Sequence, residues 1–159
     1  MIEFSNEDMF SMNLDVLVNT VNCKGVMGKG IAKQFKWRFP SYYIYYRSIC
    51  RTDLAKPGNV ILSSSFDQSM TYAFTGPKYI ISFFTKDDWR NPSKLEWIEK
   101  GLNALVDFLL TEPILQDKSI GIPALGCGNG GLDWSIVKNL IVEKLKGLDN
   151  RIVVFDPIK

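Results

Sequence analysis

The sequence predicts an α/β fold in which helices cover both faces of a mixed, largely parallel central sheet, giving three α/β/α layers. Apolar, β-branched segments alternate along the chain with amphipathic segments of helical period, as in other folds of this class. The strand-like segments are apolar at most positions, which is typical of strands buried on both faces. A chain of 159 residues suits one domain, so we expect residues 1–159 to form a single unit.

The first half of the chain contains the strongest strand signals. Residues 15–21 form a β-branched run, and a glycine loop follows at 25–30. Apolar residues then recur at helical spacing until Pro40, which ends the helix. In order, the expected elements are a strand at 15–21, a helix from Ile31 to Phe39, a helix at 41–50, and strands at 60–62, 70–74 and 78–84, with a Gly76-Pro77 turn before the last.

The second half is expected to begin with a long helix. Ser93-Lys94-Leu95-Glu96 has the form of a capping box, in which the Ser hydroxyl and the Glu carboxylate bond free amides at the helix start. A short strand then leads to a second glycine loop, and Asp133 is placed to cap the next helix. In order, the expected elements are a helix that starts at Ser93, a strand at 120–124, a helix that follows Asp133 and ends at Gly147, and a strand at 151–155.

The composition excludes several classes of protein. The chain has no histidine, and its three cysteines show no C-x-x-C pair, so we expect neither a metal site nor a cofactor. The cysteine pattern favours a reducing, cytoplasmic location. No apolar run is long enough to span a bilayer, and the acidic N-terminus lacks the order of a secretory signal, so we expect no membrane partner. The net charge of +2 is too small to indicate nucleic acid by itself.

Two glycine loops, at 25–30 and 126–131, are the strongest candidates for a binding site. Each lies between a buried strand and a helix start, and ligands of open α/β sheets bind beyond the carboxyl ends of the strands. Glycines let the backbone approach a ligand and turn its amides toward an anion. Neither loop has the spacing of a Walker or dinucleotide-binding motif, and a tight connection is the alternative interpretation of each. Together the loops are suited to holding the two phosphates of a diphosphate.

Four polar residues near these loops are candidates for function. Lys29 lies within the first loop, where its amine can reach a phosphate. Asn22 stands at the exit of the first strand, where its amide can bond sugar hydroxyls. Asn19, inside that strand, is expected to pair with neighbouring loops, because an unpaired buried amide costs about 1–3 kcal/mol. Lys86 follows the strongest strand and is expected at its carboxyl end; a surface ion pair with an adjacent Asp is the alternative.

Three segments of the chain together resemble the macrodomain family. Residues 15–39 are similar to the first ligand loop of macrodomains, and residues 122–134 are similar to the second. The Thr-Lys-x-x-Trp-Arg stretch at 85–90, followed by Pro-Ser-Lys-Leu-Glu, resembles the DarG subgroup, antitoxins that remove ADP-ribose from thymidine in DNA. The resemblance covers nearly the whole chain and implies a macrodomain fold that binds ADP-ribose.

The resemblance also implies roles for individual residues. Asp8 occupies the position at which macrodomains place an Asp against the adenine amino group, although Glu7 stands where the family usually has Gly. Asn22 is expected at the distal ribose, and Phe155 either at the adenine side or in the core. The implied ligand residues are Asp8, Met9, Asn22, Gly28, Lys29, Gly30, Ile31, Gly126, Cys127, Gly128, Asn129, Gly130, Gly131 and Phe155.

Lys86 matches the lysine that such glycohydrolases use as their catalytic group. The resemblance implies that its amine attacks the anomeric carbon of the distal ribose or assists the cleavage electrostatically. Attack needs a neutral amine, so a pKa of about 10.4 in free lysine must fall to about 7. Lys29 or Arg90 can lower this pKa, whereas Asp87 and Asp88 raise it if their carboxylates face the amine.

The resemblance leaves more than one class of substrate open. Related protein-directed enzymes use an Asp where this chain has Gly130, and Asp133 is expected to cap a helix, so a nucleobase-linked substrate is favoured over a protein-linked ester. The expected function is an ADP-ribosyl glycohydrolase whose partner is DNA with thymidine-linked ADP-ribose. An ADP-ribose 1″-phosphate phosphatase and a non-catalytic ADP-ribose-binding module are the alternatives. DarG proteins carry a further domain that binds the toxin, and we expect no such domain in this chain.

Overall fold

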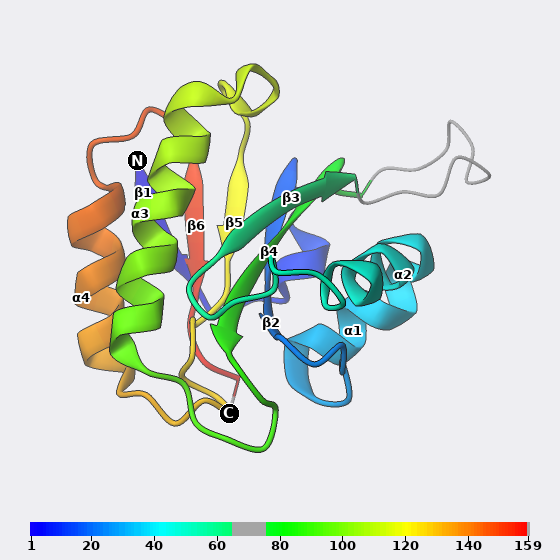
Figure 1. Cartoon of the computed structure of the whole chain (residues 1–159). Coiled ribbons are helices and arrows are strands. Elements are labelled where there is room, and N and C mark those ends of the chain that lie inside the picture. The colour runs from blue at the N-terminus through cyan, green and yellow to red at the C-terminus, as the bar shows by residue number, and fades with distance from the viewer. Residues whose placement is uncertain (65–75, 159) are drawn as a thin grey trace.

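A computed structural model describes residues 1–64 and 76–158, which contain one six-stranded sheet (Figure 1). The strands follow the spatial order β1-β6-β5-β2-β4-β3. β3 is antiparallel to β4 and every other neighbouring pair is parallel, which confirms the predicted mixed, largely parallel sheet. The strands are β1 (Ile2–Ser5), β2 (Val16–Asn22), β3 (Val60–Ser64), β4 (Tyr79–Lys86), β5 (Ile120–Ile122) and β6 (Ile152–Phe155).

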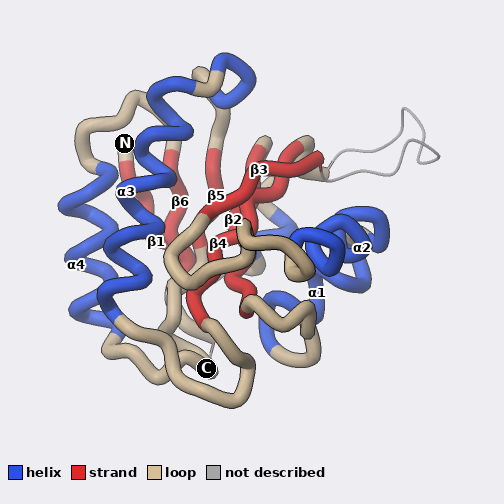
Figure 2. Tube along the Cα trace, viewed as in Figure 1, coloured by secondary structure: helices blue, strands red, loops and turns tan. Residues whose placement is uncertain are grey.

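Helices cover both faces of the sheet. They are α1 (Gly30–Arg38), α2 (Pro40–Ile49), α3 (Leu95–Thr111) and α4 (Trp134–Leu145), with short 3-10 helices at η1 (Met9–Ser11) and η2 (Pro113–Leu115). α3 and α4 pack on one face and α1 and α2 on the other, as Figures 1 and 2 show, so the predicted three layers are confirmed. Within the described ranges, no helix has both the length and the apolar character needed to cross a bilayer.

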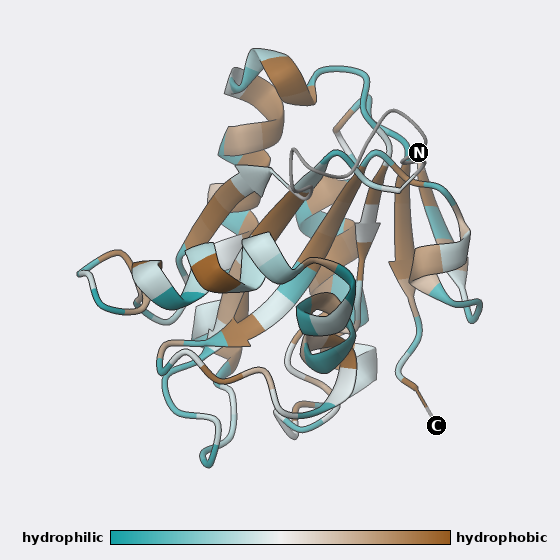
Figure 3. Ribbon diagram, turned by 90° about the vertical axis from the view of Figure 1, so that its right-hand side faces the viewer, coloured by the Kyte–Doolittle hydropathy of each residue, from teal (hydrophilic) through white to brown (hydrophobic). Residues whose placement is uncertain are grey.

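The alternation of side chains along β2 explains the two helical layers. Val16 and Val18 belong to the apolar cluster under α3 and α4, whereas Leu17 and Val21 belong to the cluster under α1 and α2. Because successive side chains of a strand point to opposite faces, a strand between two helical layers is apolar at almost every position. Figure 3 shows the result: most strand segments are hydrophobic, and the loops at their ends are largely polar.

Asn19 is a fully buried polar residue inside β2. Its Nδ2 donates to the Tyr42 hydroxyl of α2 at 3.1 Å and lies 3.9 Å from the sulfur of Met27. The same Tyr42 hydroxyl bonds Ser82 Oγ of β4 at 2.6 Å. The sequence predicts that Asn19 pairs with a neighbouring loop, and Met27 does belong to the first glycine loop. The closer partner of Asn19, however, is Tyr42, which belongs to a helix. Asn19 therefore ties β2 to the α1–α2 layer.

The structure differs from the sequence-based expectation at two places. α3 begins at Leu95 with Lys94 as its N-cap, so the predicted capping box is wrong. Ser93 is instead buried, and its backbone N–H donates to the Gly130 carbonyl at 3.0 Å, which fixes Ser93 against the second glycine loop. β1 is an additional strand that the sequence pattern does not indicate, because it is short and lies at the sheet edge. The strand predicted at 70–74 lies outside the described residues.

Gly101 shows how closely α3 packs on the sheet. A Cβ at this position would overlap the ring of Phe83 in β4. Alanine favours a helix interior over glycine by about 1 kcal/mol, but overpacking a core typically costs about 1–3 kcal/mol. We therefore expect Gly101→Ala to lower the free energy of unfolding, measured by urea titration. Gly147→Ala is the control, because a Cβ there meets nothing within 4 Å; equal stability of the two variants would contradict the expected overlap.

Candidate active site

An open cleft of about 1530 Å³ lies at the carboxyl ends of β2 and β4. The two strands are parallel neighbours, and Asn22 pairs with Lys86 after a register shift that follows Val21, so both residues reach the same edge of the sheet. Residues of both glycine loops line this cleft as well. Ligands of open α/β sheets bind at such an edge, which is the position that the strand–loop–helix order predicts.

The two glycine loops lie next to each other in this cleft. A Cβ on Gly30 of the first loop would be 3.6 Å from the side-chain nitrogen of Asn129 in the second. The first loop ends at the start of α1, where Lys29 is the N-cap residue. A helix N-terminus presents backbone amides and partial positive charge, which favour an anion. The structure thus brings the loops together, as the sequence predicts.

Two glycines give the second loop its shape, and a third leaves room for a ligand. Gly126 has φ +71°, in the left-handed region, and its carbonyl accepts a hydrogen bond from the Leu132 N–H at 3.0 Å. Gly130 has no space for a Cβ, which would overlap the Gly126 carbonyl and the Ser93 hydroxyl. Gly128, in contrast, has nothing within 4 Å of its Cβ position and lines the cleft. A ligand can therefore approach the backbone closely at Gly128.

Lys86, the last residue of β4, extends its amine to the second loop. Its Nζ donates to the carbonyl of Asn129 at 3.0 Å and to the carbonyl of Trp89 at 3.3 Å. Partial burial lowers the pKa of the Lys86 amine below its ordinary value of 10.5, and the positive charge of Lys29 lowers this pKa further. Both effects favour the neutral amine. A neutral amine can donate to both carbonyls and still keep its lone pair for a reacting atom.

The carboxylates that follow Lys86 are paired with other cations. Asp87 lies 3.9 Å from the Lys24 amine. Asp88 accepts hydrogen bonds from Arg90 Nε at 3.0 Å and Nη2 at 2.8 Å, and these bonds lower the pKa of the Asp88 carboxyl to about 2. The alternative that Lys86 forms a surface ion pair with an adjacent Asp is therefore wrong. Arg90, one of two cations expected to lower the Lys86 pKa, is engaged with Asp88 instead.

A comparison with known families places this arrangement in one of them. Residues 18–141, which include both glycine loops and Lys86, match the family model of the Macro domain. This chain belongs to the macrodomain family.

Curated proteins similar to this macrodomain are named for reactions of ADP-ribose. A DNA ADP-ribosyl glycohydrolase of Mycobacterium tuberculosis is 42% identical over 158 residues, and one of Thermus aquaticus is 38% identical over 160 residues. The alignments cover 99% and 100% of this chain but 42% of each relative, so the chain spans less than half the length of these proteins. An ADP-ribose 1″-phosphate phosphatase of Scheffersomyces stipitis is 31% identical over 100 residues, which cover 59% of this chain and 58% of that protein.

Solved structures share the fold of this macrodomain over its whole length. The macrodomain of Mycobacterium tuberculosis DarG has a TM-score of 0.88 at 38% identity, with 99% of both chains covered. The macrodomain of Thermus aquaticus DarG has a TM-score of 0.85 at 37% identity, again with 99% of both chains covered. Thermosipho africanus DarTG in complex with ADP-ribose has a TM-score of 0.88 at 33% identity, covering 99% of this chain and 42% of that chain. The resemblance to DarG macrodomains is therefore confirmed.

Asn22 organises the first glycine loop of the macrodomain. Its Oδ1 accepts hydrogen bonds from the N–H groups of Lys24 at 2.9 Å and Val26 at 3.4 Å, and its Nδ2 donates to the Val26 carbonyl at 2.8 Å. The Tyr46 hydroxyl of α2 donates to the Asn22 carbonyl at 2.7 Å and lies 3.1 Å from Oδ1. Asn22 lines the cleft, but these bonds engage its amide with the loop. Its contact with a ribose stays a prediction.

Asp8, Met9 and Phe155 also line the cleft. Asp8 Oδ1 caps η1 by accepting a hydrogen bond from the Phe10 N–H at 3.0 Å. Phe155, at the end of β6, is buried with Met9 in one apolar cluster and still borders the cleft. Both interpretations of Phe155, as a core aromatic and as a wall of the site, therefore fit its position. The adenine contacts expected of these residues stay predictions.

The remaining predicted ligand residues line the same cleft. They are Gly28, Lys29, Gly30, Ile31, Gly126, Cys127, Gly128, Asn129, Gly130 and Gly131. Burial, with the Asp133 carboxylate nearby, raises the pKa of the Cys127 thiol to about 11, which disfavours the thiolate that a nucleophilic cysteine needs. Asp133 caps α4, as the sequence predicts, and its Oδ1 accepts from the Ser135 N–H at 2.8 Å.

The cleft contains two segments that the sequence does not single out for ligand binding. Residues 89–92 follow β4, and residues 156–158 follow β6. The signal that identifies both is their position directly after the carboxyl end of a parallel strand. From the sequence, Arg90 is a candidate only through its charge, and the ring of Trp89, which is exposed in the structure, has no expected role.

Proposed function

We propose that this macrodomain binds ADP-ribose in the cleft and removes it from thymidine in DNA, with Lys86 as the catalytic residue. The observation that carries the proposal is the Lys86 amine, which contacts Asn129 of the second glycine loop and has a lowered pKa. The names of the similar glycohydrolases and the ADP-ribose complex of a similar structure support the same ligand and bond. We also propose that residues 1–159 form one domain and that this domain binds ADP-ribose.

In this proposal the diphosphate lies between the two glycine loops. The N-terminus of α1 favours its negative charges, and Lys29 stands at that N-terminus. Gly128 leaves space for the diphosphate to approach the backbone of the second loop. We assign the adenine to the part of the cleft lined by Asp8, Met9 and Phe155.

The distal ribose then lies against Lys86. The neutral amine attacks the anomeric carbon, the bond from this carbon to the nucleobase nitrogen breaks, and the base leaves with the electron pair and takes up a proton. Water cleaves the resulting lysine adduct and releases ADP-ribose. The lowered pKa of Lys86 makes the neutral amine available for attack. A charged amine would instead stabilise the negative charge that develops on the departing base.

Gly130 supports a nucleobase-linked substrate over a protein-linked ester. The protein-directed enzymes that the sequence resembles use an Asp at this position. Here even a Cβ would overlap the Gly126 carbonyl, so the loop must rearrange to accept any side chain. Asp133, the nearest acid that follows in sequence, is engaged in capping α4. The site therefore combines an amine with a second loop that carries no carboxylate.

Two substrates test this proposal. The protein is incubated with single-stranded DNA that carries ADP-ribosylated thymidine and, separately, with ADP-ribose 1″-phosphate. We expect unmodified DNA and free ADP-ribose from the first, resolved by gel and chromatography, and no phosphate from the second. Phosphate release without cleavage of the modified DNA would identify the protein as an ADP-ribose 1″-phosphate phosphatase, the activity for which the similar Scheffersomyces stipitis protein is named. Binding of ADP-ribose with turnover of neither substrate would identify a binding module and refute the proposed hydrolysis.

The rate of hydrolysis is expected to follow the ionisation of Lys86. The rate of attack follows the fraction of Lys86 that is neutral, so kcat rises as the pH passes through its pKa, and the midpoint lies below the ordinary value of 10.5 because this pKa is lowered. Lys29→Gln removes the neighbouring positive charge and is expected to move the midpoint of the kcat profile to higher pH. The KM of this variant reports separately on phosphate binding. An unchanged midpoint would contradict the action of Lys29 on the amine.

A further inference from the structure

We propose that Trp89 and Arg90 form a binding surface for the DNA strand that carries the modified nucleotide, with Trp89 stacking on a neighbouring base and Arg90 contacting the phosphate backbone. This inference rests on the proposed function and specifies which part of the substrate lies outside the ADP-ribose cleft. It assigns a role to the second half of the Thr-Lys-x-x-Trp-Arg segment, which the hydrolysis step itself does not use.

Trp89 is an aromatic ring that the fold leaves partly uncovered at the mouth of the cleft. Its exposed fraction is 46%, and it lines the cleft together with Lys86. Trp89 belongs to neither of the two apolar clusters that form the core. Aromatic rings of this kind bind single-stranded nucleic acid by stacking, because every base offers a flat face.

Arg90 is oriented by the protein and still available to a ligand. Its guanidinium lies 5.4 Å from the centre of the Trp89 ring and is held by Asp88 through Nε and Nη2. The Arg90 side chain nevertheless remains 66% exposed. Among the described residues, Asp88 is the one carboxylate that pairs with it. A fixed guanidinium beside an indole therefore presents a cation and an aromatic face to the same ligand.

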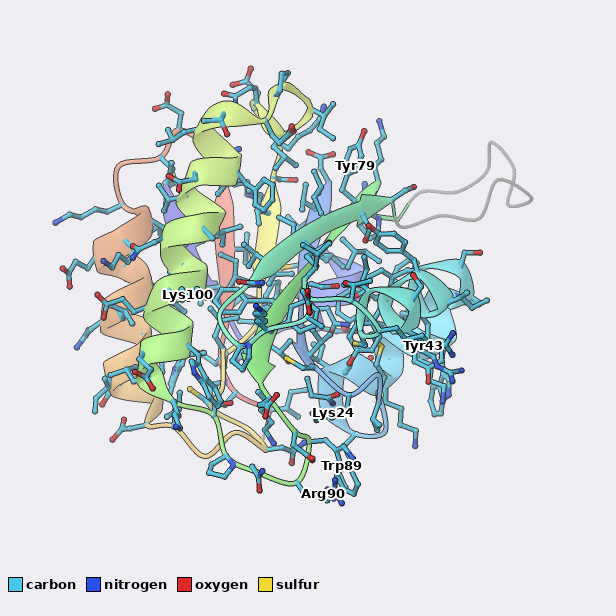
Figure 4. The ribbon with its side chains drawn as sticks, viewed as in Figure 1. Lys24, Tyr43, Tyr79, Trp89, Arg90 and Lys100 are labelled. Atoms are coloured by element: carbon cyan, nitrogen blue, oxygen red, sulfur yellow. The ribbon has the colours of Figure 1, made fainter. Side chains whose placement is uncertain are left out.

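The charge at this end of the cleft suits a polyanion. Three cations, Lys24, Lys29 and Arg90, stand near the Lys86 amine, and the carboxylates of Asp87 and Asp88 pair with Lys24 and Arg90. Figure 4 shows Lys24, Trp89 and Arg90 at the same end of the molecule. Positive charge with an interleaved aromatic ring is the pattern of a surface that follows a single strand. A peptide acceptor, which need not carry a backbone charge, would not require an exposed guanidinium beside the ring.

The surface is directly connected to the catalytic group. The Trp89 carbonyl accepts a hydrogen bond from the Lys86 amine at 3.3 Å, so the Trp89 backbone lies beside the reacting end of the cleft. A nucleotide joined to the distal ribose at Lys86 must leave the cleft close to this point. Because the bond involves the carbonyl, the variant Trp89→Ala removes the ring and keeps the contact with Lys86.

The experiment compares two ligands that differ only in the strand. One is a labelled single-stranded oligonucleotide with one ADP-ribosylated thymidine, and the other is the ADP-ribosylated thymidine nucleoside. Their affinities are measured by fluorescence anisotropy and competition in a Lys86→Ala background, which keeps the ligands intact. The ratio of the two affinities gives the contribution of the strand. If Lys86→Ala still cleaves the oligonucleotide, the same ratio is taken from kcat/KM.

We expect Trp89→Ala to lower this ratio by about tenfold, in the range that loss of one stacked base produces. Trp89→Phe keeps an aromatic face and is expected to retain most of the ratio. Arg90→Gln is expected to weaken the dependence of oligonucleotide affinity on salt concentration. Trp37→Ala is the matched control, because Trp37 is 68% exposed and has the Lys33 amine 4.8 Å from its ring centre, but it does not line the cleft.

Several results would overturn the inference. One is an equal loss of affinity for the oligonucleotide and the nucleoside in Trp89→Ala, and another is no loss at all. An ADP-ribosylated peptide that loses as much affinity as the oligonucleotide would assign the surface to acceptors in general. A different result would contradict the proposed function alone. In that case the wild-type protein binds the oligonucleotide more tightly than the nucleoside, as the inference expects, but does not cleave it.

Discussion

Replacement of Lys86 by alanine is expected to lower kcat on ADP-ribosylated DNA by about a thousandfold, within the range that one positioned catalytic group contributes. The effect is expected mainly in kcat, since the diphosphate and adenine are assigned to other residues of the cleft. Single-turnover cleavage of the modified oligonucleotide measures the chemical step, and calorimetric titration with ADP-ribose measures binding. An alanine variant that cleaves as fast as the wild type would contradict the assignment of Lys86.

Lys86→Arg separates the two possible roles of the amine. Arginine keeps the positive charge but is not deprotonated in proteins, so it cannot attack as a neutral nucleophile. We expect the arginine variant to be as inactive as the alanine variant, because the pKa of Lys86 is lowered in this site.

Borohydride provides a second measurement, since the ring-opened lysine adduct is an imine that hydride reduces to a stable amine. Mass spectrometry should then find an ADP-ribosyl group on the wild type and not on the variants, whereas substantial activity of Lys86→Arg without an adduct would favour the electrostatic role.

The buried parts of this fold are predictable from the sequence, and the edges are less so. β2 and β4 lie between two helical layers, so they are buried at nearly every position and are rich in β-branched and aromatic residues. β1 is only partly buried at the sheet edge, and Glu3 and Ser5 interrupt its apolar pattern. Ser93 has the sequence signature of a helix cap, but the packing of the second glycine loop places it one residue before the N-cap. A long-range contact thus overrides a local signal.

The candidate site is predictable where it depends on strand ends and glycine loops. Lys86 comes at the end of a long apolar run, and this position in the sequence alone predicts that it lies at the carboxyl edge of the sheet. The partners of its amine are not predictable, because Asn129 lies 43 positions away and is brought near by the fold. The same holds for Asn22, whose amide is held by its own loop and by the Tyr46 hydroxyl of a helix. Spacing in the sequence identifies candidates, and long-range packing decides which atoms they contact.

Gly128→Glu is expected to weaken ADP-ribose binding by at least a factor of about one hundred, because like charges brought together at a binding site cost several kcal/mol. Nothing lies within 4 Å of the Cβ position of Gly128, and its backbone is outside the left-handed region, so the protein should fold with the new side chain. The carboxylate would then stand in the space assigned to the diphosphate. Calorimetric titration measures the affinity, and an unchanged melting temperature shows that the fold is intact.

Gly128→Gln is the matched control, since glutamine has nearly the size of glutamate and no charge. If the diphosphate lies beside Gly128, glutamine should weaken binding less than glutamate, and the difference between them should shrink as salt screens the repulsion. Gly130, two positions further, is not suited to this test, because a Cβ there overlaps the Gly126 carbonyl and a loss of binding would follow from a changed loop. Equal affinities of the Glu and Gln variants at all salt concentrations would mean that no anion lies beside Gly128, and the diphosphate would have to be placed elsewhere in the cleft.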